Sequence, residues 1–203
     1  MVIKSYFLLI NNRRYISMLC INYLYFKTCI IVFINFNITM NAVAWMDIAL
    51  KKAAASLKVG EVPVGCLFIY NNEIIAESNN TVNETCNATR HAEMNCIDQV
   101  LVFCKERCLD YKEVFSNIDI IVTVEPCIMC TSALYQLRVR SIIYGCRNDR
   151  FGGCVSVFKV SNVYDTKVTI MGDIKSKEAI NLLKNFYEGT NPNAPECKAK
   201  KKL

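Results

Sequence analysis

The sequence of 203 residues contains one histidine, His91, against 12 cysteines. Any chemistry that needs an imidazole from this chain therefore has a single candidate. The sequence also lacks internal repeats and a second Cys-x-x-Cys pair, which argues against a repeat protein and against a four-ligand structural zinc finger. With 53% hydrophobic and 21% charged residues, the composition excludes intrinsic disorder and collagen, and it predicts one domain with a sizeable core.

Acidic residues are missing from both ends of the chain. Residues 1–46 hold four basic and no acidic residues, and residues 198–202 hold four lysines and no acid. The stretch between them holds all 18 acidic residues and 16 of the 24 basic ones, so its net charge is −2. The formal charge of +6 therefore belongs to the two ends, and the composition predicts no basic surface on the body of the domain.

The cysteines are not spaced like a disulfide framework. Cys66, Cys96, Cys104 and Cys146 lie inside apolar helix or strand patterns, where a free cysteine behaves as a small buried hydrophobic residue. We therefore expect a reduced, intracellular protein without disulfides.

A hydrophobic run long enough for a membrane span is also missing. The apolar stretch in residues 15–38 is interrupted by asparagine and lysine, and a span needs about 20 consecutive apolar residues. We expect no membrane association and interpret residues 1–39 as an atypical N-terminal extension. It has three interpretations: a signal or anchor, an organellar presequence, or an extension upstream of a native start at Met40, which we favour.

Residues 40–190 have regular patterns that predict one α/β domain, followed by a Lys-rich tail over residues 191–203. A helix with a Gly stop and a hairpin open the domain, and continuous β-branched runs later in the chain indicate strands buried on both faces. Helix–strand alternation after a hairpin predicts a three-layer α/β/α fold with a mixed five-stranded sheet. The expected helices are 45–57, 91–108, 126–137 and 175–188, with a polar loop at 79–90, and the expected strands are 64–70, 73–78, 118–124, 141–146 and 167–171.

Two short motifs carry the candidate chemistry, His91-Ala92-Glu93 and Pro126-Cys127-Ile128-Met129-Cys130. Two thiolates and one imidazole give three protein ligands, the number found at a catalytic zinc that keeps one position for water. Both motifs fall at predicted helix starts, where the helix dipole favours thiolates. Glu93 would lie beside the zinc-bound water as general acid and base. His-x-Glu followed by Pro-Cys-x-x-Cys is the signature of zinc-dependent nucleobase deaminases.

At these motifs the sequence resembles the tRNA-specific adenosine deaminases of the cytidine-deaminase-like superfamily, most closely the catalytic subunits of their eukaryotic heterodimeric branch. The similarity runs from Trp45 to Lys202. It is carried by E-V-P-V-G at 61–65, N-A-T-R-H-A-E-M at 87–94, V-T-V-E-P-C-I-M-C at 122–130, Y-G-C-R-N-D-R-F-G-G-C at 144–154 and N-P-N-A-P at 191–195. The resemblance implies a cytidine-deaminase-like fold and zinc-dependent hydrolysis of adenosine to inosine at the wobble position of tRNA anticodons.

The resemblance also implies roles for individual residues. The metal ligands would be His91, Cys127 and Cys130 for Zn²⁺, and the catalytic acid and base would be Glu93. Base contacts are expected from Asn80 and Val64, with backbone near Ala92 and Glu125 positioning the base. Phosphates of the RNA are expected to contact the tail lysines, whose alternative role is a solubilising charged end: Lys198, Lys200, Lys201 and Lys202.

The implied partners are tRNA and a related deaminase-fold subunit that lacks the catalytic glutamate, with a homodimer as the fallback. The implied location is the cytoplasm, the nucleus or both, and organellar targeting by residues 1–39 stays open.

Two other functions also stay open. A deaminase of free cytidine, deoxycytidylate or guanine shares both motifs, although the lysine tail and residues 150–154 disfavour it. A non-catalytic tRNA-binding subunit with structural zinc is disfavoured by Glu93.

Overall fold

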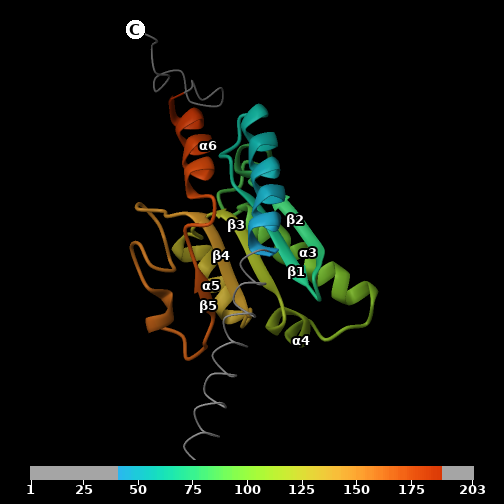
Figure 1. Cartoon of the computed structure of the whole chain (residues 1–203). Helices are drawn as coiled ribbons and strands as arrows, with labels where there is room; N and C mark the ends of the chain where they lie inside the picture. Colours follow the sequence, from blue (N-terminus) through green and yellow to red (C-terminus); the bar gives the residue numbers. More distant parts are fainter. Residues whose placement is uncertain (1–40, 189–203) are drawn as a thin grey trace, which may run out of the picture. The chain divides into compact units, whose positions relative to one another are not determined.

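The computed structural model describes residues 41–188, so the extension at 1–39 and the lysine tail at 191–203 lie outside the described residues. A five-stranded sheet in the order β2-β1-β3-β4-β5 forms the middle of the described fold (Figure 1). β1 runs antiparallel to β2 and to β3, whereas β3, β4 and β5 run parallel, which confirms the predicted mixed sheet. The strands are β1 (Gly65–Tyr70), β2 (Glu73–Asn79), β3 (Asp119–Val124), β4 (Ser141–Cys146) and β5 (Thr169–Met171).

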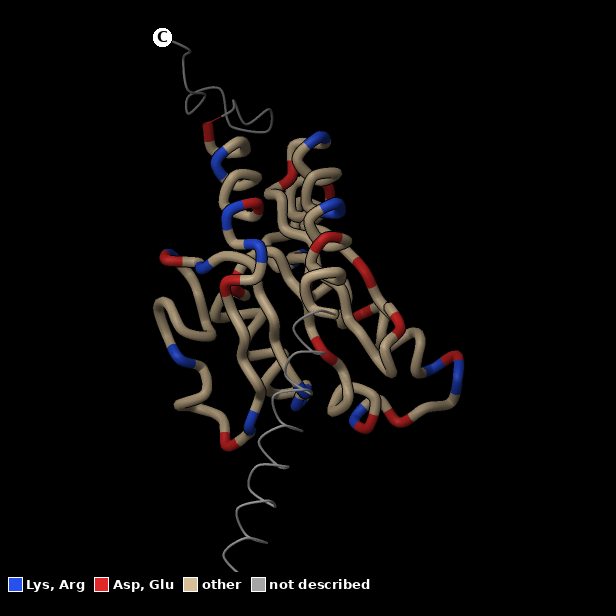
Figure 2. Tube along the Cα trace, in the orientation of Figure 1, with Lys and Arg blue, Asp and Glu red and all other residues tan. Residues whose placement is uncertain are grey.

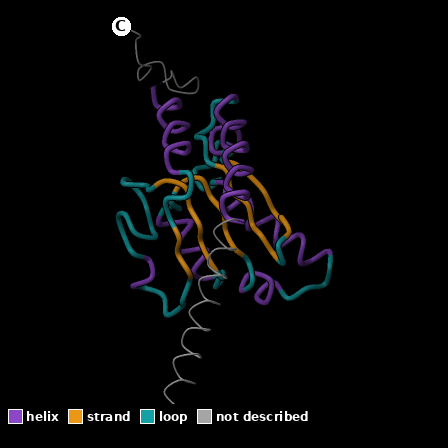
Figure 3. The backbone as a smooth tube through the Cα atoms, viewed as in Figure 1, coloured by secondary structure: helices purple, strands orange, loops and turns teal. Residues whose placement is uncertain are grey.

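Helices cover both faces of this sheet (Figure 3). Besides a helix described over residues 41–58, they are α2 (Val82–Thr85), α3 (Ala92–Glu106), α4 (Tyr111–Ser116), α5 (Ile128–Gln136), the 3₁₀ turn η1 (Val160–Asn162) and α6 (Ser176–Glu188). Side chains of α3, α4 and α5 pack with Phe68, Ile120 and Ile142 on one face. The helix at 41–58 packs against Leu67 and Ile121 on the other face. α6 joins that second layer through Ala179, which contacts Val124 and Cys146.

β3 carries three consecutive apolar residues, Ile120, Ile121 and Val122, because both of its faces are covered. Ile120 and Val122 belong to the core under α3 and α5, whereas Ile121 belongs to the core under the helix at 41–58. A strand covered on both faces buries both sets of alternating side chains, so its sequence does not alternate. The three-layer α/β/α architecture predicted from these runs is confirmed.

Some boundaries differ from the sequence prediction. α3 begins at Ala92 because His91 has extended backbone at the N-cap, and it ends at Glu106 rather than residue 108. α5 begins at Ile128 rather than Pro126, because Cys127 is also an extended N-cap, with φ −66° and ψ 167°. The predicted loop 79–90 contains α2, and α4 was not predicted at all. Both helices are too short to show a helical repeat of apolar residues.

One glycine permits a close approach that positions the first strand. A Cβ atom on Gly65 would lie 2.1 Å from the carbonyl oxygen of Ala49, in the helix at 41–58. Only glycine allows β1 to begin this close to that helix. Residues Val62 and Val64, immediately before β1, are thereby held at the sheet edge where the cavity described below is found.

Basic and acidic residues are interspersed along the described part of the chain (Figure 2). All nine cysteines in residues 41–188 are free thiols, and six of them are buried. Within the same residues, no helix combines the length and the apolar character that crossing a bilayer requires.

Candidate active site

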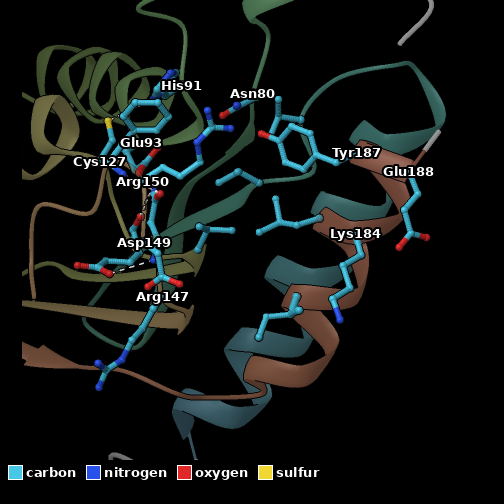
Figure 4. Close-up of a pocket in the computed structure, with 18 residues that line it drawn as sticks. Asn80, His91, Glu93, Cys127, Arg147, Asp149, Arg150, Lys184, Tyr187 and Glu188 are labelled. Carbon is cyan, nitrogen blue, oxygen red and sulfur yellow. Dashed lines mark hydrogen bonds between the residues drawn. The ribbon is translucent and has the colours of Figure 1, made fainter. Parts of the chain in front are cut away.

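The candidate site lies at one edge of the sheet, beyond the carboxyl ends of β3 and β4. Because β1 is antiparallel to β3, its beginning and the end of β2 meet at this same edge. Ligand sites of open α/β sheets occur at such strand ends. A cavity of about 590 Å³ opens here, lined by segments that follow β2, β3 and β4 and by α6 (Figure 4).

The three predicted metal ligands come together at this cavity. The Nδ1 atom of His91 lies 3.6 Å from Sγ of Cys127 and 3.5 Å from Sγ of Cys130. His91 and Cys127 are the N-cap residues of α3 and α5, and neither side chain caps its own helix. N-cap side chains usually bond to the first free N–H groups of the helix. Here both side chains are instead directed toward a common point.

These distances fit a zinc ion. Zinc binds sulfur at about 2.3 Å and imidazole nitrogen at about 2.0 Å, so tetrahedral coordination separates the two donors by about 3.6 Å. All three donor atoms lie within 4.8 Å of one another. The donor set of one imidazole and two thiols has room for a fourth ligand, as a catalytic zinc requires.

The pKa values of the two thiols are shifted in opposite directions. Hydrogen bonding from Cys130 and then from His91 outweighs burial and lowers the pKa of Cys127 to about 4. The same hydrogen bond and burial raise the pKa of Cys130, while the bond to Cys127 raises the pKa of His91. Two helix N-termini point here, and their dipoles favour negative charge. A divalent cation would displace protons from the two thiols and from the ring nitrogen of His91 that binds it, which leaves a complete ligand set.

Glu93 lies in the first turn of α3, two residues after the ligand His91. It lines the cavity (Figure 4), yet the residue is only 3% exposed. Burial raises the pKa of its carboxyl group to about 7. A carboxyl group with a pKa near neutrality can both accept and return a proton, which is the property of a general acid and base.

Asn80 and Ala92 are linked to each other. The backbone N–H of Ala92 donates to Oδ1 of Asn80 at 2.9 Å, so this buried asparagine satisfies the first turn of α3. Asn80 also lines the cavity, as expected of a base contact, whereas Ala92 is fully buried and does not line it. The structure therefore places Ala92 behind the site, with its N–H already occupied.

Val64 and Glu125 both line the cavity. Val64 is half-buried and presents an apolar surface, as expected for packing against a base. Glu125 is 1% exposed, and its carboxylate accepts hydrogen bonds from the segment after β4. Burial alone would raise the pKa of Glu125, but the hydrogen bonds from Ser156, Asn148 and Val155 lower it below its ordinary value.

Comparison with known proteins agrees with this geometry. The model of the cytidine and deoxycytidylate deaminase zinc-binding region matches residues 40–146, which contain all three ligands and Glu93. The chain belongs to this deaminase family. It is 50% identical over 162 residues to tRNA-specific adenosine deaminase 2 of Xenopus tropicalis, covering 78% of this chain and 95% of that protein.

Two further relatives extend the comparison. The deaminase is 37% identical to the tRNA-specific adenosine deaminase subunit tad2 of Schizosaccharomyces pombe, over 77% of this chain and 40% of that longer protein. A solved structure from a study of A-to-I editing by tRNA:A34 deaminases superposes with a TM-score of 0.61 at 26% identity. It covers 68% of this chain and 97% of its own. The family and the donor geometry together assign zinc as the cofactor of this enzyme.

Some lining residues of the deaminase had no predicted role. Arg147, Arg150 and Phe151 follow β4, and Lys184 and Tyr187 belong to α6, on the opposite side of the cavity (Figure 4). The sequence predicts no role for the segment after β4 beyond its part in the resemblance, and it predicts residues 175–188 only as a helix. The tail lysines lie outside the described residues, and their role stays a prediction.

Proposed function

We propose that this deaminase converts adenosine to inosine at the wobble position of tRNA anticodons, as the catalytic subunit of a heterodimer. The chemistry is carried by one observation: the donor atoms of His91, Cys127 and Cys130 lie within 4.8 Å of one another, beside a cavity that His91, Cys127 and Glu93 line. The assignment of tRNA adenosine as the substrate is supported by relatives that are named tRNA-specific adenosine deaminases and are about 50% identical to this chain over the aligned residues.

Zinc held by His91, Cys127 and Cys130 would supply Lewis-acid activation of a water molecule near neutral pH. Glu93 accepts a proton from that water and delivers it to N1 of the adenine ring, which makes C6 electrophilic. The water oxygen then bonds to C6. Glu93 transfers the second proton of the water to the amino group, the C6–N bond breaks, and ammonia leaves. The net reaction consumes one water and yields inosine and ammonia.

The cavity suits a nucleobase that has left its stack. Its volume of about 590 Å³ falls within the usual range of ligand pockets, about 300–1,000 Å³. Val64 offers an apolar surface to the ring, and Asn80 offers an amide. An anticodon-loop adenosine is already single-stranded, so its extrusion costs less than opening a duplex.

Cations and aromatic rings around the cavity favour a polynucleotide over a free nucleoside. Arg147 and Arg150 lie on one side of the cavity and Lys184 on the other (Figure 4). Phe151, which also lines the cavity, is 59% exposed. Guanidinium and ammonium groups bind phosphates, and exposed rings stack on unpaired bases. The four lysines of the predicted tail would add to this cationic surface.

The proposal of a partner subunit is supported by exposed apolar side chains beside the metal ligands. Ile128 and Met129, between the two cysteine ligands, are 39% and 37% exposed. The N–H of Ile128 donates to the carbonyl of Phe151, and in the segment that follows, Phe158 is 43% exposed. Exposed apolar side chains on neighbouring segments are typical of protein interfaces. We assign these side chains to contact with the related deaminase-fold subunit; one relative is itself named a subunit.

The test uses the zinc-loaded full chain, alone and with the partner subunit. The substrates are a tRNA with adenosine at the wobble position, the same tRNA with that adenosine moved one position along the loop, and free adenosine, cytidine and guanine. Inosine is read by sequencing and ammonia by a coupled assay. Conversion of the wobble adenosine alone supports the proposal. Ammonia release from a free base or nucleoside with unchanged tRNA would identify a small-molecule deaminase instead.

A further inference from the structure

We propose that Glu125 is a positioning residue, whose buried carboxylate ties the metal-ligand segment at 125–130 to residues 147–156, here called the cavity loop. In this way Glu125 sets the wall of the substrate cavity without touching the substrate. The effect expected on tRNA rests on the proposed function, whereas the effect on the loop does not.

The carboxylate of Glu125 accepts five hydrogen bonds from the cavity loop. Oε1 accepts the backbone N–H groups of Cys154, Val155 and Ser156 at 3.1, 2.7 and 3.0 Å. Oε2 accepts the N–H of Asn148 at 3.0 Å and the hydroxyl of Ser156. Successive N–H groups that converge on one oxygen form an anion-binding concavity. The loop is therefore folded around this one negative charge.

The backbones of the two segments are also joined. The N–H of Ile128 donates to the carbonyl of Phe151, and the N–H of Gly153 donates to the carbonyl of Pro126, both at 2.9 Å. Cys127 and Gly152 form an antiparallel bridge between these two bonds. The ligand Cys127 is thus held between the cavity loop on one side and α5 on the other.

Two consecutive glycines permit this approach. A Cβ atom on Gly152 would lie 2.7 Å from Oε1 of Glu125, and one on Gly153 would lie 2.5 Å from Oγ1 of Thr131. Side chains at either position would push the loop away from the carboxylate and from the first turn of α5. The Gly-Gly pair in the sequence is explained by this contact.

The cavity loop supplies five of the eighteen residues that line the cavity: Arg147, Asn148, Asp149, Arg150 and Phe151. Figure 4 shows Arg147, Asp149 and Arg150 along the side that faces α6. Glu125 itself is 1% exposed, and the loop already occupies both of its oxygens. A substrate is therefore influenced by Glu125 through the loop.

Three variants of the zinc-loaded full chain test this assignment, with the partner subunit present if the wild type requires it. Glu125→Gln keeps the shape of the side chain but removes its negative charge. It also places the amide N–H group of glutamine against the N–H donors of the cavity loop. Ser156→Ala removes one donor and leaves every other contact. Glu61→Gln is the matched control. Glu61 is 2% exposed and accepts the N–H groups of Asn83 and Glu84 at 2.7 and 2.8 Å, but neither of these residues lines the cavity.

Hydrogen exchange, zinc content and steady-state kinetics are measured on each variant. In Glu125→Gln we expect exchange at the amides of residues 154–156 to accelerate by about tenfold or more, since bonds to a charged acceptor are lost. We expect zinc to stay bound and KM for tRNA to rise by about tenfold with a smaller change in kcat, because the loop contributes binding groups. Ser156→Ala should shift both quantities the same way by a smaller factor, and Glu61→Gln should shift neither.

Two results would overturn the assignment. The first is unchanged exchange in the cavity loop of both Glu125→Gln and Ser156→Ala. The second is a loss of zinc and kcat with KM unchanged, which would make Glu125 a support of the metal site alone. If wild-type protein forms no inosine in tRNA, the proposed function fails, and the exchange and zinc measurements still decide the role of Glu125.

Discussion

Glu93 and Glu125 are both buried carboxylates within two residues of a metal ligand, and their surroundings differ in one respect. Glu125 accepts five hydrogen bonds, which lower its pKa and keep it ionised. At Glu93 burial dominates and raises the pKa to about 7. Because fixed N–H and O–H donors surround Glu125, its carboxylate stays ionised and organises the loop. Glu93 has fewer such donors, so its carboxyl group can exchange protons near neutral pH.

The two regions that carry Glu93 and Glu125 also differ in the groups that they place at the cavity. The helix starts at 91–93 and 127–130 hold the three metal donors and Glu93, and the cavity loop at 147–156 holds groups that line the cavity. Damage to the first region should remove the chemistry, whereas damage to the second should weaken binding. Four substitutions or deletions, taken from the largest expected effect to the smallest, test this division.

Cys130→Ser should cause the largest loss, because a neutral hydroxyl replaces a fully buried thiolate ligand. We expect zinc content to fall well below one per chain, activity to fall below detection, and the melting temperature to drop, since a bound metal stabilises the folded state. Atomic absorption and calorimetry measure this. Cys104→Ser, a buried cysteine outside the site, is the control and should keep its zinc. Full zinc content in Cys130→Ser would contradict the ligand assignment.

Glu93→Gln should lower kcat by about 10²–10⁴-fold, the usual contribution of a general acid and base, and leave zinc bound. The melting temperature should not fall, because a neutral amide replaces a carboxylate whose charge is disfavoured by burial. Single-turnover kinetics and zinc analysis on the same sample test both statements. A variant that loses zinc along with activity would show that Glu93 supports the metal rather than moving protons.

The three metal donors could be predicted from sequence because zinc chemistry requires particular side chains at helix starts, and the structure brings those donors together. His91, Cys127 and Cys130 could be identified by residue type and order alone, and the buried runs of β3 and β4 predicted the sheet. The cavity loop could not be predicted in this way. Its contacts join residues 125 and 154–156, which are distant in sequence, and a glutamate before a proline gives no indication that it accepts five bonds. Arg147 and Lys184 line the cavity because of the order of the strands and the position of α6, and neither can be inferred from the local sequence.

Gly152→Ala should destabilise the protein by about 1–3 kcal/mol, the usual cost of overpacking. The added methyl group would lie 2.6 Å from the carbonyl oxygen of Asn148 and 2.7 Å from Glu125. Urea unfolding measures this change, and zinc content should stay near one per chain. Ser116→Ala, at an exposed position on α4, is the control and should change the free energy of unfolding little. Equal stability of wild type and Gly152→Ala would contradict the packing described for the cavity loop.

Deletion of residues 195–203 should have the smallest effect, a several-fold loss of tRNA affinity at physiological salt. Each lysine that contacts a phosphate adds to the salt dependence of binding, so the slope of log K against log salt should also fall. Binding titrations at several salt concentrations measure both. The fold and the zinc content should not change. Unchanged tRNA affinity and an unchanged salt dependence would contradict a role of the tail in tRNA binding and would favour its alternative role as a solubilising end.

The central claim is tested most directly by the time course of inosine formation at the wobble adenosine of tRNA, with zinc-loaded wild type and Glu93→Gln compared at equal zinc content. Wild type should convert the adenosine and release one ammonia per inosine, and the variant should show almost no conversion. Conversion by Glu93→Gln at the wild-type rate would contradict the role given to this carboxylate.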